Sequence, residues 1–293
     1  MRRVHRNEAE SGLAAAGPAL LAACAFASVS VFGKVSFVHG GDIATFLVTR
    51  GVVGIAIIWI WLKGVPRARA FTRRETAVAL GLGLLYAANV YTLFRAIEVM
   101  SVPLVSLTYF LYPVITGVVG AFTRLDVLGP RGVAAAVAAF AGLAMMIGAE
   151  PAQLVWSGLA FATAAAGFRA TMLLVTRAAL PVSDPRDVSW YTMLGSTAVF
   201  AALLGAQGGV WFPSGAVGWA ALLWASVAAA VAVIAMFASA RRVGPFRTAL
   251  FMNAEPVATI LLAAIVLGEG LAPSQWAGAA VMIGALFWFQ QRR

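Results

Sequence analysis

Long apolar stretches, separated by short polar or charged turns, run along the whole chain. They fall at residues 17–38, 43–62, 76–98, 102–123, 131–149, 153–176, 188–206, 215–240, 246–267 and 273–291. Each is close to the roughly 20 mostly apolar residues that a helix needs to cross a bilayer. The pattern therefore predicts an all-α polytopic membrane protein with ten transmembrane helices and no soluble domain.

Composition supports the membrane assignment. Of the 293 residues, 62% are hydrophobic and 11% are charged, whereas a soluble domain carries about 25% charged residues. The mean hydropathy is +0.90. The net charge of +10 does not favour nucleic-acid binding, because the basic residues punctuate the ends of apolar stretches. Cys24 is the single cysteine, so an internal disulfide is excluded.

The distribution of Lys and Arg predicts the orientation. If the N-terminus is cytoplasmic, 17 of the 21 lie at the two termini or in the cytoplasmic turns near 63–74, 124–131, 177–186 and 241–247. The other four, Lys34, Arg50, Arg95 and Arg169, lie inside apolar stretches. This bias follows the positive-inside rule. It predicts an inner-membrane protein with both termini in the cytoplasm.

The two halves of the chain share a pattern at an offset of 143 residues. Pro113 falls on Pro256, Tyr112 on Glu255 and Asp126 on Glu269. The halves are therefore residues 1–149 and 150–293, with five predicted helices each. An odd number of helices makes the second copy enter the membrane from the opposite side. The sequence predicts two inverted five-helix repeats, as in many secondary transporters.

At this point the residues resemble a known family. Five-helix repeats with a proline in the fourth helix are similar to those of the drug/metabolite transporter superfamily. The stretch AEPVATILLAAIVLGEGLAPSQWAGAAVMIGA (254–285) resembles the signature of its bacterial EamA-type members: a Glu-Pro pair, a Gly-Glu pair and a Gly-rich last helix. The first half departs from it, because Tyr112 replaces the Glu and Leu125-Asp126 replaces Gly-Glu. Within the superfamily, the length and the aromatic residues resemble the bacterial exporters of aromatic and other neutral amino acids.

Motifs of several enzyme classes are missing. Gly33-Lys34 is followed by valine rather than Ser or Thr, so it is not a phosphate-binding loop. The two histidines, His5 and His39, lie outside any HExxH motif, so a zinc protease of that type is excluded. The sequence predicts a protein that is not an enzyme and that uses no metal and no cofactor.

Pro113 and Pro256 are the candidate gating or hinge residues. Each comes ten or eleven residues into its apolar stretch, which is about 15 Å, or half of the roughly 30 Å hydrocarbon core. A proline removes one helical hydrogen bond and frees a carbonyl. Transporters bind substrate near this depth on interrupted helices. A structural kink that faces protein is the alternative.

Polar and aromatic side chains at the same depth form the candidate substrate site. The first half offers aromatic walls with polar tips, while the second half offers small alanines at the matching positions, which leaves space. Such a pocket suits an aromatic or medium apolar side chain; ordinary packing is the alternative for each residue. The candidates are Tyr86, Asn89, Tyr109, Tyr112, Ala229, Ala232, Asn253 and Glu255.

Three charged residues inside apolar stretches need an explanation, because a charge at the bilayer centre must face protein or water. Arg169 is a candidate partner for Glu255 or for a substrate carboxylate, and Arg50 is a second candidate for an ion pair. Glu255 itself has three readings. It binds a substrate ammonium, couples transport to protons, or anchors the broken helix through hydrogen bonds or an ion pair.

The sequence and the resemblance together predict export of amino acids, aromatic or neutral, or similar small metabolites by alternating access. The partners are then a small-molecule substrate and membrane lipid, and no nucleic acid. A drug or cationic-compound exporter of the same fold is the alternative within this class. A membrane scaffold or sensor without transport is the alternative outside it. The sequence leaves the substrate, the direction and the oligomeric state open.

Overall fold

The computed structural model describes residues 2–65, 69–99, 102–125, 129–147, 155–267 and 272–290. Regular structure in these ranges is helical throughout. The helices are α1 (Arg2–Val38), α2 (Ile43–Gly64), α3 (Arg73–Val99), α4 (Val102–Tyr109), α5 (Tyr112–Phe122), α6 (Pro130–Ile147), α7 (Trp156–Ala179), α8 (Pro185–Gln207), α9 (Gly215–Val243), α10 (Pro245–Met252), α11 (Ala254–Leu267) and α12 (Pro273–Gln290).

These helices form ten segments, which agrees with the number predicted from the sequence. The helices α4 and α5 are two halves of one segment, and α10 and α11 are two halves of another. Seven spans are long and apolar enough to cross a membrane, and the shorter apolar helices are Tyr112–Phe122 and Pro130–Met145. The described residues therefore have the architecture of a multi-pass membrane protein.

Local chemistry sets most helix ends. Asp42 caps α2 and accepts hydrogen bonds from the backbone N–H groups of Ala44 (2.8 Å) and Thr45 (3.1 Å). Pro185 occupies the first turn of α8, where its missing N–H costs nothing. The predicted first membrane segment, 17–38, agrees with the apolar span Ala16–Val38, and the helix that contains it begins earlier, at Arg2.

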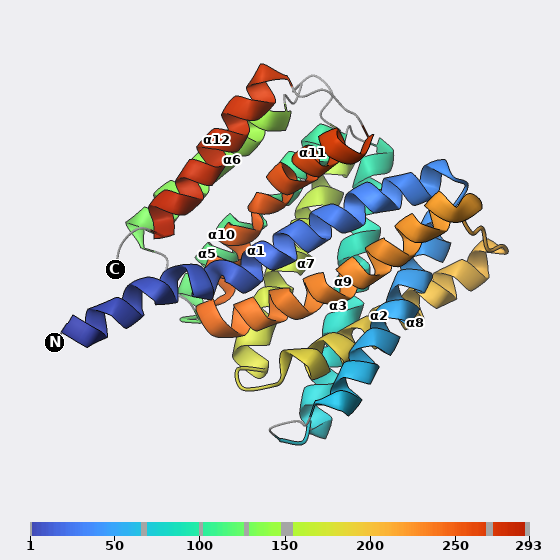
Figure 1. Cartoon of the computed structure of the whole chain (residues 1–293), viewed down its shortest axis with the longest axis horizontal. Helices are drawn as coiled ribbons and strands as arrows, with labels where there is room; N and C mark the ends of the chain where they lie inside the picture. Colours follow the sequence, from blue (N-terminus) through green and yellow to red (C-terminus); the bar gives the residue numbers. More distant parts are fainter. Residues whose placement is uncertain are drawn as a thin grey trace.

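The main contacts between segments occur in matched pairs. α1 packs on α9 and α3 on α7; α3 packs on α8 and α2 on α9; α1 packs on α11 and α5 on α7. A shift of five segments converts the first member of each pair into the second. α6 packs on α12, and Figure 1 shows these two side by side at the edge of the bundle, while α1 runs along α9.

The backbones of α3 and α8 touch where two glycines face each other. A Cβ atom on Gly83 would lie 2.5 Å from the carbonyl oxygen of Thr192, and one on Gly195 would lie 2.8 Å from that of Leu80. Both separations are shorter than any ordinary contact, so neither position accepts a side chain. The crossing places α3, from the first half, directly against α8, from the second.

Candidate functional site

Two helix interruptions lie at matching places in the two halves. α4 ends at Tyr109 and α5 begins at Tyr112; α10 ends at Met252 and α11 begins at Ala254. Pro113 and Pro256 follow each interruption and lack the N–H group that would bond the carbonyls of Tyr109 and Met252. The structure therefore has broken helices at the two prolines that the sequence singled out.

Arg169 lies between the two interruptions. It is near the middle of α7 and is 3% exposed. Its guanidinium carbon is 5.9 Å from the ring centre of Tyr112, which begins α5, and its Nη2 atom is 3.9 Å from the sulfur of Met252, which ends α10. The ring of Phe26 covers it at 4.8 Å. One buried cation thus contacts both broken segments and α1.

Glu255 supplies a carboxylate near this cation. It lies in the first turn of α11, is partly exposed, and interacts electrostatically with Arg169. Both residues are described, and no salt bridge within 4.0 Å joins them. The ion pair predicted between them is therefore not formed as a direct contact. The two opposite charges are close enough to interact electrostatically but do not form a salt bridge.

Two buried polar atoms in this region have no hydrogen-bond partner. They are Nε of Arg169 and Oδ1 of Asn253, and Asn253 is 3% exposed. Leaving a buried polar atom unpaired costs about 1–3 kcal/mol, so such atoms are rare in native structures. Asn253 is the residue at the interruption between α10 and α11. A donor and an acceptor therefore remain available to a ligand beside the breaks.

Aromatic side chains line the same region. The ring centres of Tyr109 and Tyr112 are 5.7 Å apart, and Tyr109 interacts with the side chain of Asn89. The Tyr112 hydroxyl donates to the carbonyl of Ala249 (3.3 Å), and the Asn89 amide donates to that of Ala165 (2.7 Å). The structure therefore brings Asn89, Tyr109 and Tyr112 to the interruptions, as the sequence predicted.

Tyr86 and Ala229 belong to a neighbouring pocket. The Tyr86 hydroxyl accepts a hydrogen bond from Nη2 of Arg50 (3.0 Å). Among the described residues Arg50 forms no salt bridge, so the ion pair for which it was a candidate is not formed there. Ala229 lines the same pocket, whose volume is about 10 Å³. Ala232 is fully buried. The space expected beside the two alanines is therefore filled by protein in this structure.

Hydrogen bonds tie the halves together at one end of the bundle, where α2 ends. The carboxylate of Glu75 accepts from Arg69 (Nη1 to Oε2, 3.0 Å) and from Thr72, and also from the hydroxyl of Ser183 in the loop before α8. The Ser183 carbonyl accepts from Arg241 of α9 at 2.6 Å. These residues, called the Glu75 network below, were not found from the sequence, because their spacing carries no signal.

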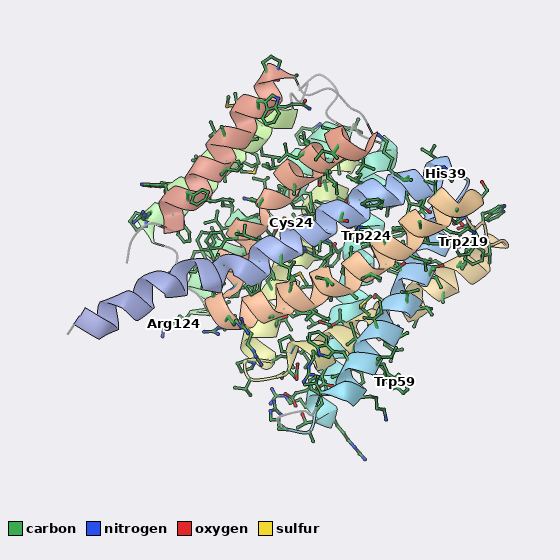
Figure 2. All side chains as sticks on the ribbon, in the orientation of Figure 1. Cys24, His39, Trp59, Arg124, Trp219 and Trp224 are labelled. Carbon is green, nitrogen blue, oxygen red and sulfur yellow. The ribbon has the colours of Figure 1, made fainter. Side chains whose placement is uncertain are left out.

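A second set of bonds ties the halves together at the opposite end. The backbone N–H of Asp42 donates to the carbonyl of Trp211 (3.1 Å), and that of Ser214 donates to the carbonyl of His39 (2.7 Å). Gln207 donates to the Asp42 carboxylate at 3.4 Å. Figure 2 shows His39 and Trp219 together at this end, and Arg124 on the opposite side. These bonds are called the Asp42 network below.

An open cavity of about 730 Å³ lies away from the interruptions. It is apolar, and α1, α9 and α11 line it with Phe32, Val35, Val217, Trp224 and Val266 among others. Most of its lining is that of a lipid-facing surface, and His39, which also lines it, has its Nδ1 atom 2.8 Å from the Val35 carbonyl oxygen. The polar cluster around Arg169 is therefore the better candidate site.

Comparisons with known proteins concern the fold and the second half of the chain. Residues 156–290, which span α7 to α12, match the model of the "EamA-like transporter family". A solved structure titled "Crystal structure of protein" superposes with a TM-score of 0.76 over 95% of this chain and 98% of that chain. At 18% identity it shows a shared fold alone. No curated protein matches the chain.

Proposed function

We propose that this protein is a secondary transporter that exports zwitterionic amino acids, aromatic or neutral, across the bacterial inner membrane by alternating access. The family match over residues 156–290 and the multi-pass fold support transport of a small molecule. The matched pairs of helix contacts support two inverted repeats, residues 1–149 and 150–293, related by a two-fold axis in the membrane plane.

The observation that carries the substrate class is the separated pair of opposite charges. Arg169 and Glu255 face one region without a salt bridge, and Nε of Arg169 and Oδ1 of Asn253 are unpaired. An amino acid presents a carboxylate and an ammonium on one carbon. Its carboxylate matches Arg169, and its ammonium matches Glu255 with the Asn253 carbonyl oxygen. Charge-assisted bonds of this kind are about twice as strong as neutral ones.

The aromatic residues supply the remaining recognition. Phe26, Tyr109 and Tyr112 surround the cation from α1, α4 and α5. Rings of this kind bind apolar and aromatic side chains through their faces and edges. The exporter of cationic compounds is less well supported, because a buried Arg169 repels a solute that carries only positive charge.

Counterflow into proteoliposomes tests the proposal. An aromatic amino acid should exchange, whereas its amide, which lacks the carboxylate, and its deaminated acid, which lacks the ammonium, should exchange at least about tenfold more slowly, a loss of about 1.4 kcal/mol each. Preferred exchange of the amide would support the cation exporter instead. No exchange of any solute, by protein that remains folded, would support the scaffold or sensor.

A further inference from the structure

Arg50 is a second buried cation, and its guanidinium points toward the interior. It lies seven residues after Ile43, where α2 begins, and is 8% exposed. Its Nη2 atom donates to the hydroxyl of Tyr86, which is thirteen residues from either end of α3. The charged group is therefore directed to mid-helix depth rather than to the nearer surface, where arginines in membranes usually place their charge.

The contacts of Arg50 include no counter-charge. Its described partners are neutral: the Tyr86 hydroxyl at 3.0 Å, and the rings of Phe46 and Tyr86, each 5.8 Å from the guanidinium carbon. Within the described part of the chain, no carboxylate forms a salt bridge with it. A charge buried in a membrane protein is expected to pair with an opposite charge. Arg50 therefore has an unmet demand for an anion.

The pocket around Arg50 supplies a second free donor. Thr197 of α8 lines the pocket and is 8% exposed, and its hydroxyl has no partner. The hydroxyls of Thr192 and Ser196 in the same pocket are already used by the carbonyls of Ala79 and Met193. A Cβ on Gly51 would lie 1.9 Å from the Thr197 hydroxyl oxygen, so the glycine beside Arg50 makes room for that donor.

The size of the pocket limits the ligand. Its volume of about 10 Å³ corresponds to about one water molecule. An amino acid is too large to enter, and a halide ion is close to water in size. We propose that Arg50 and Thr197 form a binding site for one small monovalent anion, with chloride as the cellular occupant. The anion accepts from the guanidinium and the hydroxyl and neutralises the buried charge.

This site lies next to the proposed transport site but does not depend on it. Tyr86, which holds Arg50, also interacts electrostatically with Arg169. An anion bound to Arg50 would therefore also hold Tyr86, which interacts with Arg169, in place. The halide reaches the pocket without any amino acid present, so binding can be measured on protein that has no substrate.

The test measures thermal unfolding of the purified protein in detergent, without substrate, while chloride or bromide replaces gluconate at constant ionic strength. We expect a saturable rise in the unfolding temperature of wild type, because a ligand that binds only the folded state stabilises it. Thr197→Val should weaken the chloride affinity at least tenfold, and Arg50→Gln should abolish the response. The exposed matched controls Thr163→Val and Arg74→Gln should respond as wild type does.

Binding of radioactive chloride by equilibrium dialysis provides a second measurement that does not depend on unfolding. Arg50→Lys keeps the charge but loses the planar fork, and should bind chloride at least tenfold more weakly. The proposal is wrong if wild type shows no saturable halide binding, or if Arg50→Gln binds as wild type does. An Arg50-dependent response to amino acids but not to halides would also overturn it, and would assign Arg50 to the transport site.

Discussion

The Arg169 guanidinium lies 3.9 Å from the sulfur of Met252, which links the middle of α7 to the last residue of α10. The same guanidinium lies over Tyr112 at the start of α5. A ligand that engages Arg169 therefore acts on both broken segments at once. This arrangement explains how binding at one point can bias the two halves of the bundle together.

Replacing Arg169 by methionine should abolish transport of amino acids without loss of stability. We expect transport efficiency to fall about 100-fold, near 2.8 kcal/mol, because two charge-assisted bonds to the carboxylate are lost. The unfolding temperature should stay the same or rise, because an incompletely paired buried charge is removed. Proteoliposome counterflow and thermal unfolding measure the two effects, with Arg74→Gln as the exposed control. A lower unfolding temperature together with normal transport would make Arg169 structural.

Glu255→Gln distinguishes the three roles of that residue. Among the described residues, the side-chain hydrogen bond at Glu255 runs from the Thr259 hydroxyl to the Glu255 backbone carbonyl, at 2.9 Å, which does not favour an anchor for the broken backbone. We therefore expect amino-acid binding to weaken at least tenfold, about 1.4 kcal/mol, with unchanged binding of the deaminated acid. If binding of the amino acid and of the deaminated acid weakens equally, Glu255 acts as the anchor of the broken helix instead. Loss of the pH dependence of transport alone would identify a proton-coupling group.

The Glu75 network should hold its end of the bundle closed. Ser183→Ala removes the bond that crosses from the second half to Glu75, and a hydrogen bond to a charged group contributes about 1.5–3 kcal/mol. We expect a lower unfolding temperature and faster labelling of a cysteine introduced at Ala179, beside this loop. Wild-type labelling rates in Ser183→Ala would show that the network does not control access.

The Asp42 network should lose stability in acid. Burial alone would raise the pKa of the Asp42 carboxyl, but hydrogen bonds from Thr45, Gln207 and the Trp211 backbone outweigh it and lower the pKa below its ordinary value. The stabilisation is therefore present above the ordinary value of about 4 and is lost as the pH falls through the lowered pKa. Asp42→Asn keeps an N-cap without the charge, so its unfolding temperature should depend less on pH below about 5. If the unfolding temperatures of wild type and Asp42→Asn depended on pH in the same way, the Asp42 carboxylate would not be the stabilising group.

The orientation is tested by fusing a reporter that is active only in the cytoplasm. Fusions after residues 40 and 210 should be inactive, and a fusion after residue 183 should be active, because the positive-inside rule places the basic turns inside. A reversed result at any position would contradict the inverted repeat. Both networks would then exchange their sides of the membrane.

The sequence predicted the segments well, and the reason is physical. The length of an apolar stretch is a local signal, and so are the Asp, Gly and Pro residues at its ends. The predicted starts at residues 43, 215 and 273 therefore agree with those of α2, α9 and α12. The predicted start at residue 17 agrees with the apolar span Ala16–Val38, whereas α1 itself begins at Arg2, because hydropathy marks the bilayer and not the end of the helix. Polar residues before residue 17 continue the helix beyond the apolar part.

The site was predicted only in part. Pro113 and Pro256 are visible because proline cannot donate to the helix, and Asn253 and Glu255 lie beside one of them in the sequence. The contacts of Arg169 with Phe26 and Met252 join residues 143 and 83 positions apart, and no local pattern encodes them. The bond between Arg50 and Tyr86 was missed for the same reason, and with it the separate pocket that contains Ala229.

The contact of Gly83 with Gly195 has a mechanical consequence. Two backbones that already touch cannot approach further, and they cannot separate without opening a void between α3 and α8. The motion left to this pair is rotation about the crossing, which acts as a fulcrum. In the alternating-access cycle proposed above, the far ends of both helices would swing as lever arms in opposite senses, so that opening one face of the bundle would close the other.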